Sequence, residues 1–138
     1  MNMKKTETCY NNVAQVLFDM IPEEWEKLVL YYENVNDSSQ VYYYYYPLNS
    51  DKPVYWLDVN NIFVIDNKEQ DEQINQLFDL FGEIYDDFIS QKQEPWTSLT
   101  YIIENRKVRI SYSYEDISDM SILEIEEKWK AKNGINRC

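Results

Sequence analysis

Five consecutive tyrosines, Tyr42 to Tyr46, constrain the fold of this chain more than any other stretch of its sequence. The run lies between Val41 and Pro47 and has the length and aromatic content of a β-strand. Successive side chains of a strand point to opposite faces of its sheet, so both faces of this strand are aromatic. Another part of the chain, a second copy or a different protein must therefore cover the second face.

The composition is that of a folded protein with one domain. The 138 residues are 44% apolar and 16% aromatic, with two glycines and four prolines, which argues against a disordered or low-complexity chain. The length suits one hydrophobic core, and no segment has the composition of an interdomain linker. We therefore expect a single domain over residues 1–138.

Helical spacing of apolar side chains predicts three helices. The expected ranges are about 7–20, about 69–91 and a last segment that ends near Gly134. The candidate N-caps are Thr6 or Thr8 for the first helix and Ser118 or Asp119 for the last.

Short runs rich in β-branched and aromatic residues predict strands between these helices. The runs are Leu28–Tyr32, Val41–Tyr46, Val54–Asp58, Thr100–Glu104 and Lys107–Tyr114, with Asn61–Ile65 ambiguous. The turn cluster Asn36 to Ser39 and the pair Asn105-Arg106 indicate two antiparallel hairpins. The order is α-β-β-β-α-β-β-α, without the alternation of a doubly wound fold. The predicted class is therefore α+β, an antiparallel sheet of about five strands with helices packed mainly on one face.

The middle helix has an acidic side opposite its apolar side. At about 100° per residue, this acidic side carries Glu72, Gln76, Asp79, Glu83, Asp86 and Asp87. From Asp66 through Glu94 there are nine acidic and two basic residues. Like charges four residues apart destabilise a helix by a few tenths of a kcal/mol per pair. The pattern is either an ordinary solvated face or a row of carboxylates that can occupy a basic groove made for phosphates.

The net charge of -12 argues against direct binding to nucleic acid or to an anionic membrane. A basic partner is the natural expectation, although acidity also simply aids solubility. No run approaches the ~18 apolar residues of a membrane span, and the N-terminal residues lack the apolar core of a signal peptide. Cys9 and Cys138 form no CxxC motif and there is no histidine, so we expect a reduced, cytoplasmic protein without metal or cofactor.

The sequence offers little catalytic machinery. It has no histidine for general acid–base catalysis and no GxSxG, P-loop or HExxH motif. Adjacent carboxylates such as Glu23-Glu24 are expected by chance at this acidity. The four tryptophans could form a sugar-stacking platform, but core packing is their more ordinary role. We expect a protein that is not an enzyme.

Two segments resemble a known family. Met20–Lys27 (MIPEEWEK) follows the first helix, and Glu94–Ser98 (EPWTS) follows the long acidic helix, with a tyrosine-rich hairpin between them. In this order, over about residues 10–130, they resemble the YezG/EsaG family of bacterial immunity proteins. The resemblance implies a cytoplasmic antitoxin that binds and neutralises the nuclease domain of a secreted toxin by stoichiometric contact. A nuclease needs a positive cleft for its substrate, and an acidic protein can be steered to that cleft.

Charge accelerates such an encounter, whereas buried aromatic side chains supply most of the affinity. The expected partner-binding residues are therefore Glu72, Asp79, Glu83, Asp86, Asp87, Tyr43 and Tyr45. An alternative from another class is a non-enzymatic, self-associating structural module. In that alternative, Tyr43 and Tyr45 point outward from the sheet and form the contact of a homodimer.

Overall fold

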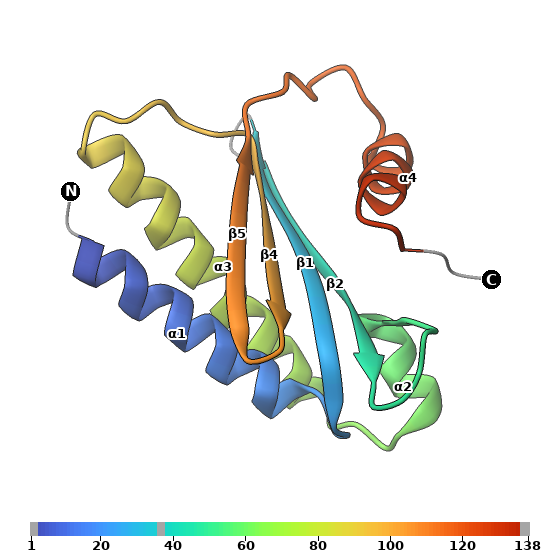
Figure 1. The fold of residues 1–138 in the computed structure, drawn as a ribbon. Helices are drawn as coiled ribbons and strands as arrows, with labels where there is room; N and C mark the ends of the chain where they lie inside the picture. The colour runs from blue at the N-terminus through green and yellow to red at the C-terminus, as the bar shows by residue number, and fades with distance from the viewer. Residues whose placement is uncertain (1–2, 36–37, 136–138) are drawn as a thin grey trace. The chain divides into compact units, whose positions relative to one another are not determined.

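The computed structural model describes residues 3–35 and 38–135, with side chains from residue 6 onward. Its elements are α1 (Met3–Met20), β1 (Trp25–Val35), β2 (Ser38–Pro47), β3 (Val54–Tyr55), the 3-10 turn η1 (Trp56–Asp58), α2 (Val59–Ile62), α3 (Asn67–Ser90), β4 (Ser98–Glu104), β5 (Lys107–Ser113) and α4 (Ile122–Lys132). The strands form one antiparallel sheet of five strands in the order β3-β2-β1-β4-β5 (Figure 1). The predicted α+β class and the order of its main elements are confirmed.

The chain divides into two compact units that interleave along the sequence. The first comprises Met1–Pro22 and Val59–Trp96, and so contains α1, α2 and α3. The second comprises Glu23–Asp58 and Thr97–Cys138, and so contains the whole sheet and α4. The expectation of a single domain over residues 1–138 stays a prediction.

In the first unit, α1 runs antiparallel to α3. Thr6 Oγ1 donates to Asp87 Oδ2 at 2.8 Å, and Cys9 Sγ donates to Glu83 Oε2 at 3.4 Å. A later residue of α1 thus meets an earlier residue of α3, as expected for antiparallel helices. Buried apolar side chains recur at helical spacing in both helices: Val13 and Leu17 in α1, and Leu77, Phe81, Ile84 and Phe88 in α3. These residues form the apolar side that helical periodicity predicts for each of the two helices.

The two ends of α3 follow from local chemistry. Asp66 is the N-cap, and its carboxylate accepts from the backbone N–H groups of Lys68 and Glu69 at 3.0 and 3.2 Å. After the helix, Pro95 precedes Trp96, which is buried and packs edge-on against the ring of Phe88 at 6.1 Å. The expected return of Trp96 to the core is confirmed.

In the second unit, α4 packs on one face of the sheet through an aromatic cluster. The rings of Tyr31 in β1 and Tyr42 in β2 are cross-strand partners that stack with centroids 4.9 Å apart. Trp129 of α4 meets both rings edge-on, at 5.5 and 5.4 Å, and its indole N–H donates to Thr100 Oγ1 at 3.0 Å. The expectation that helices lie mainly on one face of the sheet stays a prediction.

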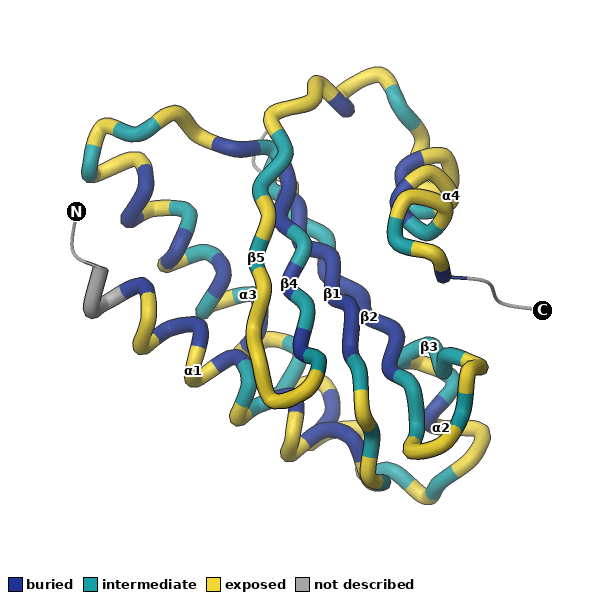
Figure 2. The backbone as a smooth tube through the Cα atoms, in the orientation of Figure 1, coloured by how far each residue is buried: buried dark blue, intermediate teal, exposed yellow. Residues whose placement is uncertain are grey.

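Four of the five tyrosines of β2, Tyr42 to Tyr45, are buried, and Tyr46 is half-buried (Figure 2). Tyr42 and Tyr44 belong to the aromatic cluster under α4. Tyr43 and Tyr45, which we expected to point outward, are only 1% and 0% exposed, so that expectation is wrong. Within this unit Tyr43 lies 6.2 Å from the ring of Trp56, and Tyr45 donates its hydroxyl proton to Glu23 at 2.7 Å. Burial raises the pKa of both phenols.

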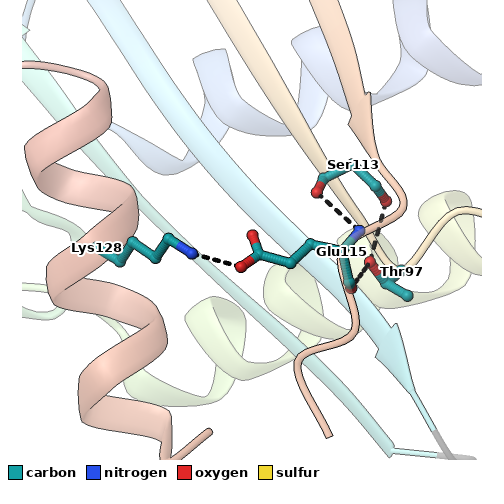
Figure 3. A network of polar contacts seen from close by, with 4 residues as sticks. All are labelled: Thr97, Ser113, Glu115 and Lys128. Atoms are coloured by element: carbon teal, nitrogen blue, oxygen red, sulfur yellow. Dashed lines mark hydrogen bonds and ion pairs between the residues drawn. The ribbon is translucent and has the colours of Figure 1, made fainter.

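The segment before α4 is held by polar contacts at the end of the sheet (Figure 3). Thr97 Oγ1 donates to the carbonyl oxygens of Ser113 and Glu115 at 3.0 and 2.7 Å, and the Glu115 carboxylate pairs with Lys128 of α4. These contacts hold the start of the segment to the sheet and link it to α4, so the segment and the aromatic cluster together position α4.

The N-cap of α4 is Ser121 and not Ser118 or Asp119. Ser121 Oγ accepts from the N–H of Glu124, whose carboxylate accepts in return from the N–H of Ser121, and this is a complete capping box. Ser118 instead donates from N–H and Oγ to Asp116 at 3.0 and 2.6 Å, and these bonds lower the pKa of Asp116. Sequence alone could not choose among three nearby residues that all suit an N-cap.

Other boundaries also differ from the prediction. The first helix begins at Met3, so Thr6 and Thr8 lie inside it and neither is its N-cap. The third strand has two residues, because Trp56–Asp58 turn into a 3-10 conformation, and the ambiguous segment starting at Asn61 is helical only through Ile62. Of the predicted turn cluster, positions 36 and 37 lie outside the described residues, as does Cys138.

The aromatic cluster yields a stability prediction. The Tyr42 hydroxyl is buried, and nothing in the described part of the chain hydrogen-bonds to it, whereas the Tyr44 hydroxyl donates to Glu126 at 2.6 Å. An unpaired buried polar group costs about 1–3 kcal/mol, so Tyr42→Phe should leave the free energy of unfolding unchanged or raise it. The matched variant Tyr44→Phe should lower it by about 1–3 kcal/mol. Urea unfolding followed by circular dichroism measures both, and a larger loss for Tyr42→Phe than for Tyr44→Phe would contradict the prediction.

Candidate functional site

Exposed carboxylates follow one side of α3. Glu72, Asp79, Glu83 and Asp86 are all exposed. Spacings of seven, four and three residues keep them on one side of the helix, in a row about 21 Å long. We call these four residues the acidic row.

The fifth expected carboxylate, Asp87, is not part of this surface. It is buried and accepts the hydrogen bond from Thr6 of α1. Periodicity put Asp87 on the same side as Asp86, but α1 packs against that edge of α3, where the Thr6 side chain meets Asp87. The expectation that Asp87 is available to a partner is therefore wrong, and its role is to join two helices.

The acidic side chains near the end of α3 destabilise the helix electrostatically. The last turn of α3 has no basic residue, and the exposed Asp86 lies near the end where the helix dipole disfavours negative charge, by about 0.3–1 kcal/mol for an exposed group. No lysine or arginine between residues 69 and 91 compensates it. A helix selected only for stability would place lysines there.

Beside the acidic row, α1 and α3 form a shallow hollow of about 430 Å³. Its lining residues are Asn12, Gln15, Val16, Asp19, Gln76, Asp79 and Leu80. Val16 and Leu80 are half-buried and supply apolar surface, while Asp19 and Asp79 bring one carboxylate from each helix. Gln15 Nε2 donates to Asp19 Oδ1 at 3.2 Å. The hollow therefore suits a ligand with a long apolar stem and a positive end.

The contribution of α1 is what the sequence reasoning missed. Asn12, Gln15 and Asp19 recur at helical spacing on the polar side of α1, and this pattern was the available signal. Only the antiparallel packing of α1 on α3 brings Asp19 near Asp79. Tyr43 and Tyr45 are buried, so neither is part of an exposed surface.

The described residues present neither a metal site nor a membrane-spanning helix. Among the described residues, no group of three or more histidines, cysteines, aspartates and glutamates has a geometry that could hold a metal ion. None of the helices in residues 3–35 and 38–135 is long and apolar enough to cross a membrane. What the described surface does present is an exposed acidic row next to a hollow with two carboxylates.

Comparison with known proteins agrees with the resemblance of the two sequence segments. The family model described as "Immunity protein YezG-like" matches residues 6–134. Immunity protein YezG of Bacillus spizizenii is 29% identical over 136 residues, which cover 96% of this chain and 84% of that protein. Immunity protein YezG of Bacillus subtilis is 26% identical over 127 residues, covering 90% and 84%.

A third relative carries a different name. Type VII secretion system protein EsaG of Staphylococcus aureus is 29% identical over 114 residues, covering 82% of this chain and 70% of that protein. The match of the family model spans nearly the whole sequence. The chain therefore belongs to the YezG-like family of immunity proteins.

Proposed function

We propose that this immunity protein neutralises the nuclease domain of a secreted toxin by stoichiometric binding, without catalysis and without a cofactor. The observation that carries the proposal is the exposed acidic row of α3 in a chain of this family. A nuclease domain holds nucleic acid in a positive cleft, and a row of carboxylates about 21 Å long offers that cleft a substitute for phosphates. Binding takes place in the cytoplasm, where the nuclease would otherwise reach nucleic acid.

The hollow between α1 and α3 supplies the short-range part of the contact. Exposed ion pairs stabilise a complex by only about 0.2–1 kcal/mol each, so charge alone gives speed and little affinity. A lysine or arginine of the target can lay its apolar stem on Val16 and Leu80 and bring its charge to Asp19 and Asp79. An arginine fits this role best, because its planar guanidinium can bind two acceptors at once.

Self-association through the tyrosine face, the alternative function, is not favoured. Tyr43 and Tyr45 are buried in the single chain, so a partner cannot reach them without rearrangement. The proposed target surface therefore consists of the acidic row and the hollow, and it leaves out Tyr43, Tyr45 and Asp87.

Nuclease protection tests the proposal directly. The chain is titrated into a toxin nuclease domain encoded next to a gene of this family, and the cleavage of plasmid DNA is followed. We expect inhibition to be complete at a fixed molar ratio and the association rate to fall as salt rises, because salt screens exposed charges. If none of several such domains is bound or inhibited, the chain is not an inhibitor of nucleases.

Charge reversal tests the acidic row. Asp79→Lys combined with Asp86→Lys should slow association by about tenfold at low salt, because steering depends on the field of the whole row. The fold should tolerate both changes, since both side chains are exposed and a lysine at position 79 faces Asp19. Stopped-flow fluorescence measures the rate.

The control makes the same change in net charge elsewhere. Glu24 and Glu26 are exposed acids of the second unit, and Glu24→Lys with Glu26→Lys should have a much smaller effect on the rate. Equal slowing by both double variants would show that only net charge matters and would reject the acidic row as the binding surface.

Asp87 should behave in the opposite way. Asp87→Ala removes the acceptor of the buried Thr6 hydroxyl and should lower the free energy of unfolding by about 1–3 kcal/mol. The association rate of the folded variant should stay within a factor of about two of the unaltered chain, since this carboxylate is buried. A stable variant that associates much more slowly would place Asp87 in the binding surface after all.

A further inference from the structure

A cavity of about 120 Å³ lies between the sheet and α4, within the second unit. Its lining side chains come from β1, β4, β5, the segment before α4 and α4 itself. None of them belongs to the acidic row or to the hollow of the first unit. A cavity of roughly 150 Å³ can hold a benzene molecule, so this one has room for a group of a few heavy atoms.

One wall of this cavity carries hydroxyl groups, where a helix packed on a sheet normally buries apolar side chains. Ser98 and Thr100 of β4 pair with Ser113 and Ser111 of β5, and all four line the cavity under α4. The neighbouring part of the same face, formed by β1 and β2, is aromatic. Small hydroxyl side chains add little to a hydrophobic core, so packing alone does not account for them. We call this cavity the hydroxyl pocket.

The hydrogen bonds already made in the hydroxyl pocket leave it rich in donors. Thr100 Oγ1 accepts from Trp129 Nε1 at 3.0 Å, and Ser113 Oγ accepts from the backbone N–H of Glu115 at 3.3 Å. Each of these hydroxyls therefore still has its own proton to donate. Ser111 is exposed and lines the pocket, so its hydroxyl is open to a ligand. A ligand that fits must bring hydrogen-bond acceptors.

The charged side chains that line the pocket favour a negative ligand. Lys128 and Lys132 lie about one turn apart on α4, and Glu115 precedes that helix. Lys128 pairs with Glu115 (Figure 3), whereas Lys132 is exposed and no acid in the described part of the chain pairs with it. Two positive charges and one negative charge leave the pocket at +1, in a chain of net charge -12.

A nearby buried carboxylate limits the charge of this ligand. Glu33 is buried and lies opposite Ser98 in the strand register, although it is not part of the lining. Its carboxylate accepts the hydroxyl proton of Tyr31, a lining residue, at 2.9 Å. Glu33 and Glu115 would both repel a ligand, and a dianion would be repelled twice as strongly as a monoanion. The pocket therefore suits an acceptor group with a single negative charge.

From these donors and charges we propose that the hydroxyl pocket binds a carboxylate group, supplied by a small carboxylic acid or by an acidic side chain of a protein. The carboxylate accepts from the Thr100 and Ser111 hydroxyls and pairs with the Lys132 ammonium. A carboxylate has one charge and about four acceptor positions, which these donors can satisfy. Since the pocket shares no residue with the acidic row or the hollow, this site does not depend on the binding of a nuclease.

Titration of the full chain with sodium acetate tests the proposal without any toxin domain. Acetate replaces chloride at constant ionic strength, and backbone amide shifts are followed by NMR. We expect saturable shifts around Ser111, Ser113 and Lys132, with a dissociation constant of about 1–10 mM for a ligand of so few atoms. Sulfate, a dianion, should bind at least about fivefold more weakly. Shifts that do not saturate, or sulfate binding as tight as acetate binding, would overturn the proposal.

Variants of the pocket test which residues hold the carboxylate. Lys132→Gln should raise the acetate dissociation constant about three- to fivefold, whereas Lys132→Arg should leave it within a factor of about two. Ser111→Ala should raise it about fivefold, because one hydrogen bond is lost. Lys107→Gln is the matched control, since it removes an exposed lysine of β5 that does not line the pocket. Equal weakening by Lys107→Gln and Lys132→Gln would show that net charge alone attracts acetate, and would overturn the site.

A capped amino acid distinguishes the two sources of the carboxylate. N-acetylglutamate amide carries its carboxylate on a short stem, so the peptide groups can stay outside a cavity of about 120 Å³. Binding as tight as that of acetate, with the same loss in Lys132→Gln, would assign the pocket to an acidic side chain of a protein. Binding of acetate alone would assign it to a small carboxylic acid. If neither compound binds, the pocket holds only solvent and the proposal is wrong.

Discussion

The stacking of Tyr31 on Tyr42, with Trp129 set edge-on against both rings, is the interaction on which the second unit depends. The stacked pair joins β1 to β2 across the sheet, and the indole attaches α4 to that pair. Aromatic pairs of this kind contribute about 0.5–1.5 kcal/mol beyond the area that they bury. The Trp129 indole N–H also donates a hydrogen bond to Thr100 of β4, so one side chain of α4 contacts the three strands β1, β2 and β4. Among the described residues the buried Tyr42 hydroxyl has no hydrogen-bond partner, and the aromatic packing of the cluster offsets this cost.

In the first unit, by contrast, acidic side chains stay exposed although this lowers the stability of the helix. Thr6 and Cys9 use two polar side chains of α3, Asp87 and Glu83, to align α1 with it. The four carboxylates of the acidic row, Glu83 among them, stay exposed without basic neighbours on their helix, against their mutual repulsion. A positive surface that met these carboxylates would offset this loss of stability. This asymmetry is the physical reason for the basic target that we propose.

Much of the fold could be predicted from local pattern. The helices α1 and α3, the two hairpins and the α+β class follow from periods of 3.6 and 2, and the family could be recognised from two short segments. Errors concentrate where several residues suit one role. Ser118, Asp119 and Ser121 all suit an N-cap, and the capping box with Glu124 decided among them. The third strand is shorter than predicted, because Trp56–Asp58 form a 3-10 turn and only two positions of β3 pair with β2.

The sequence by itself determined which residues carry charge and which strand would be aromatic on both faces. It could not determine accessibility, because accessibility depends on segments that are distant in the chain. Asp86 and Asp87 are neighbours with the same chemistry, yet one is exposed and the other lies under α1. Tyr43 and Tyr45 alternate correctly with Tyr42 and Tyr44, but alternation assigns side chains to faces and does not say what covers each face. Only the tertiary structure decided that side chains on both faces of β2 are buried.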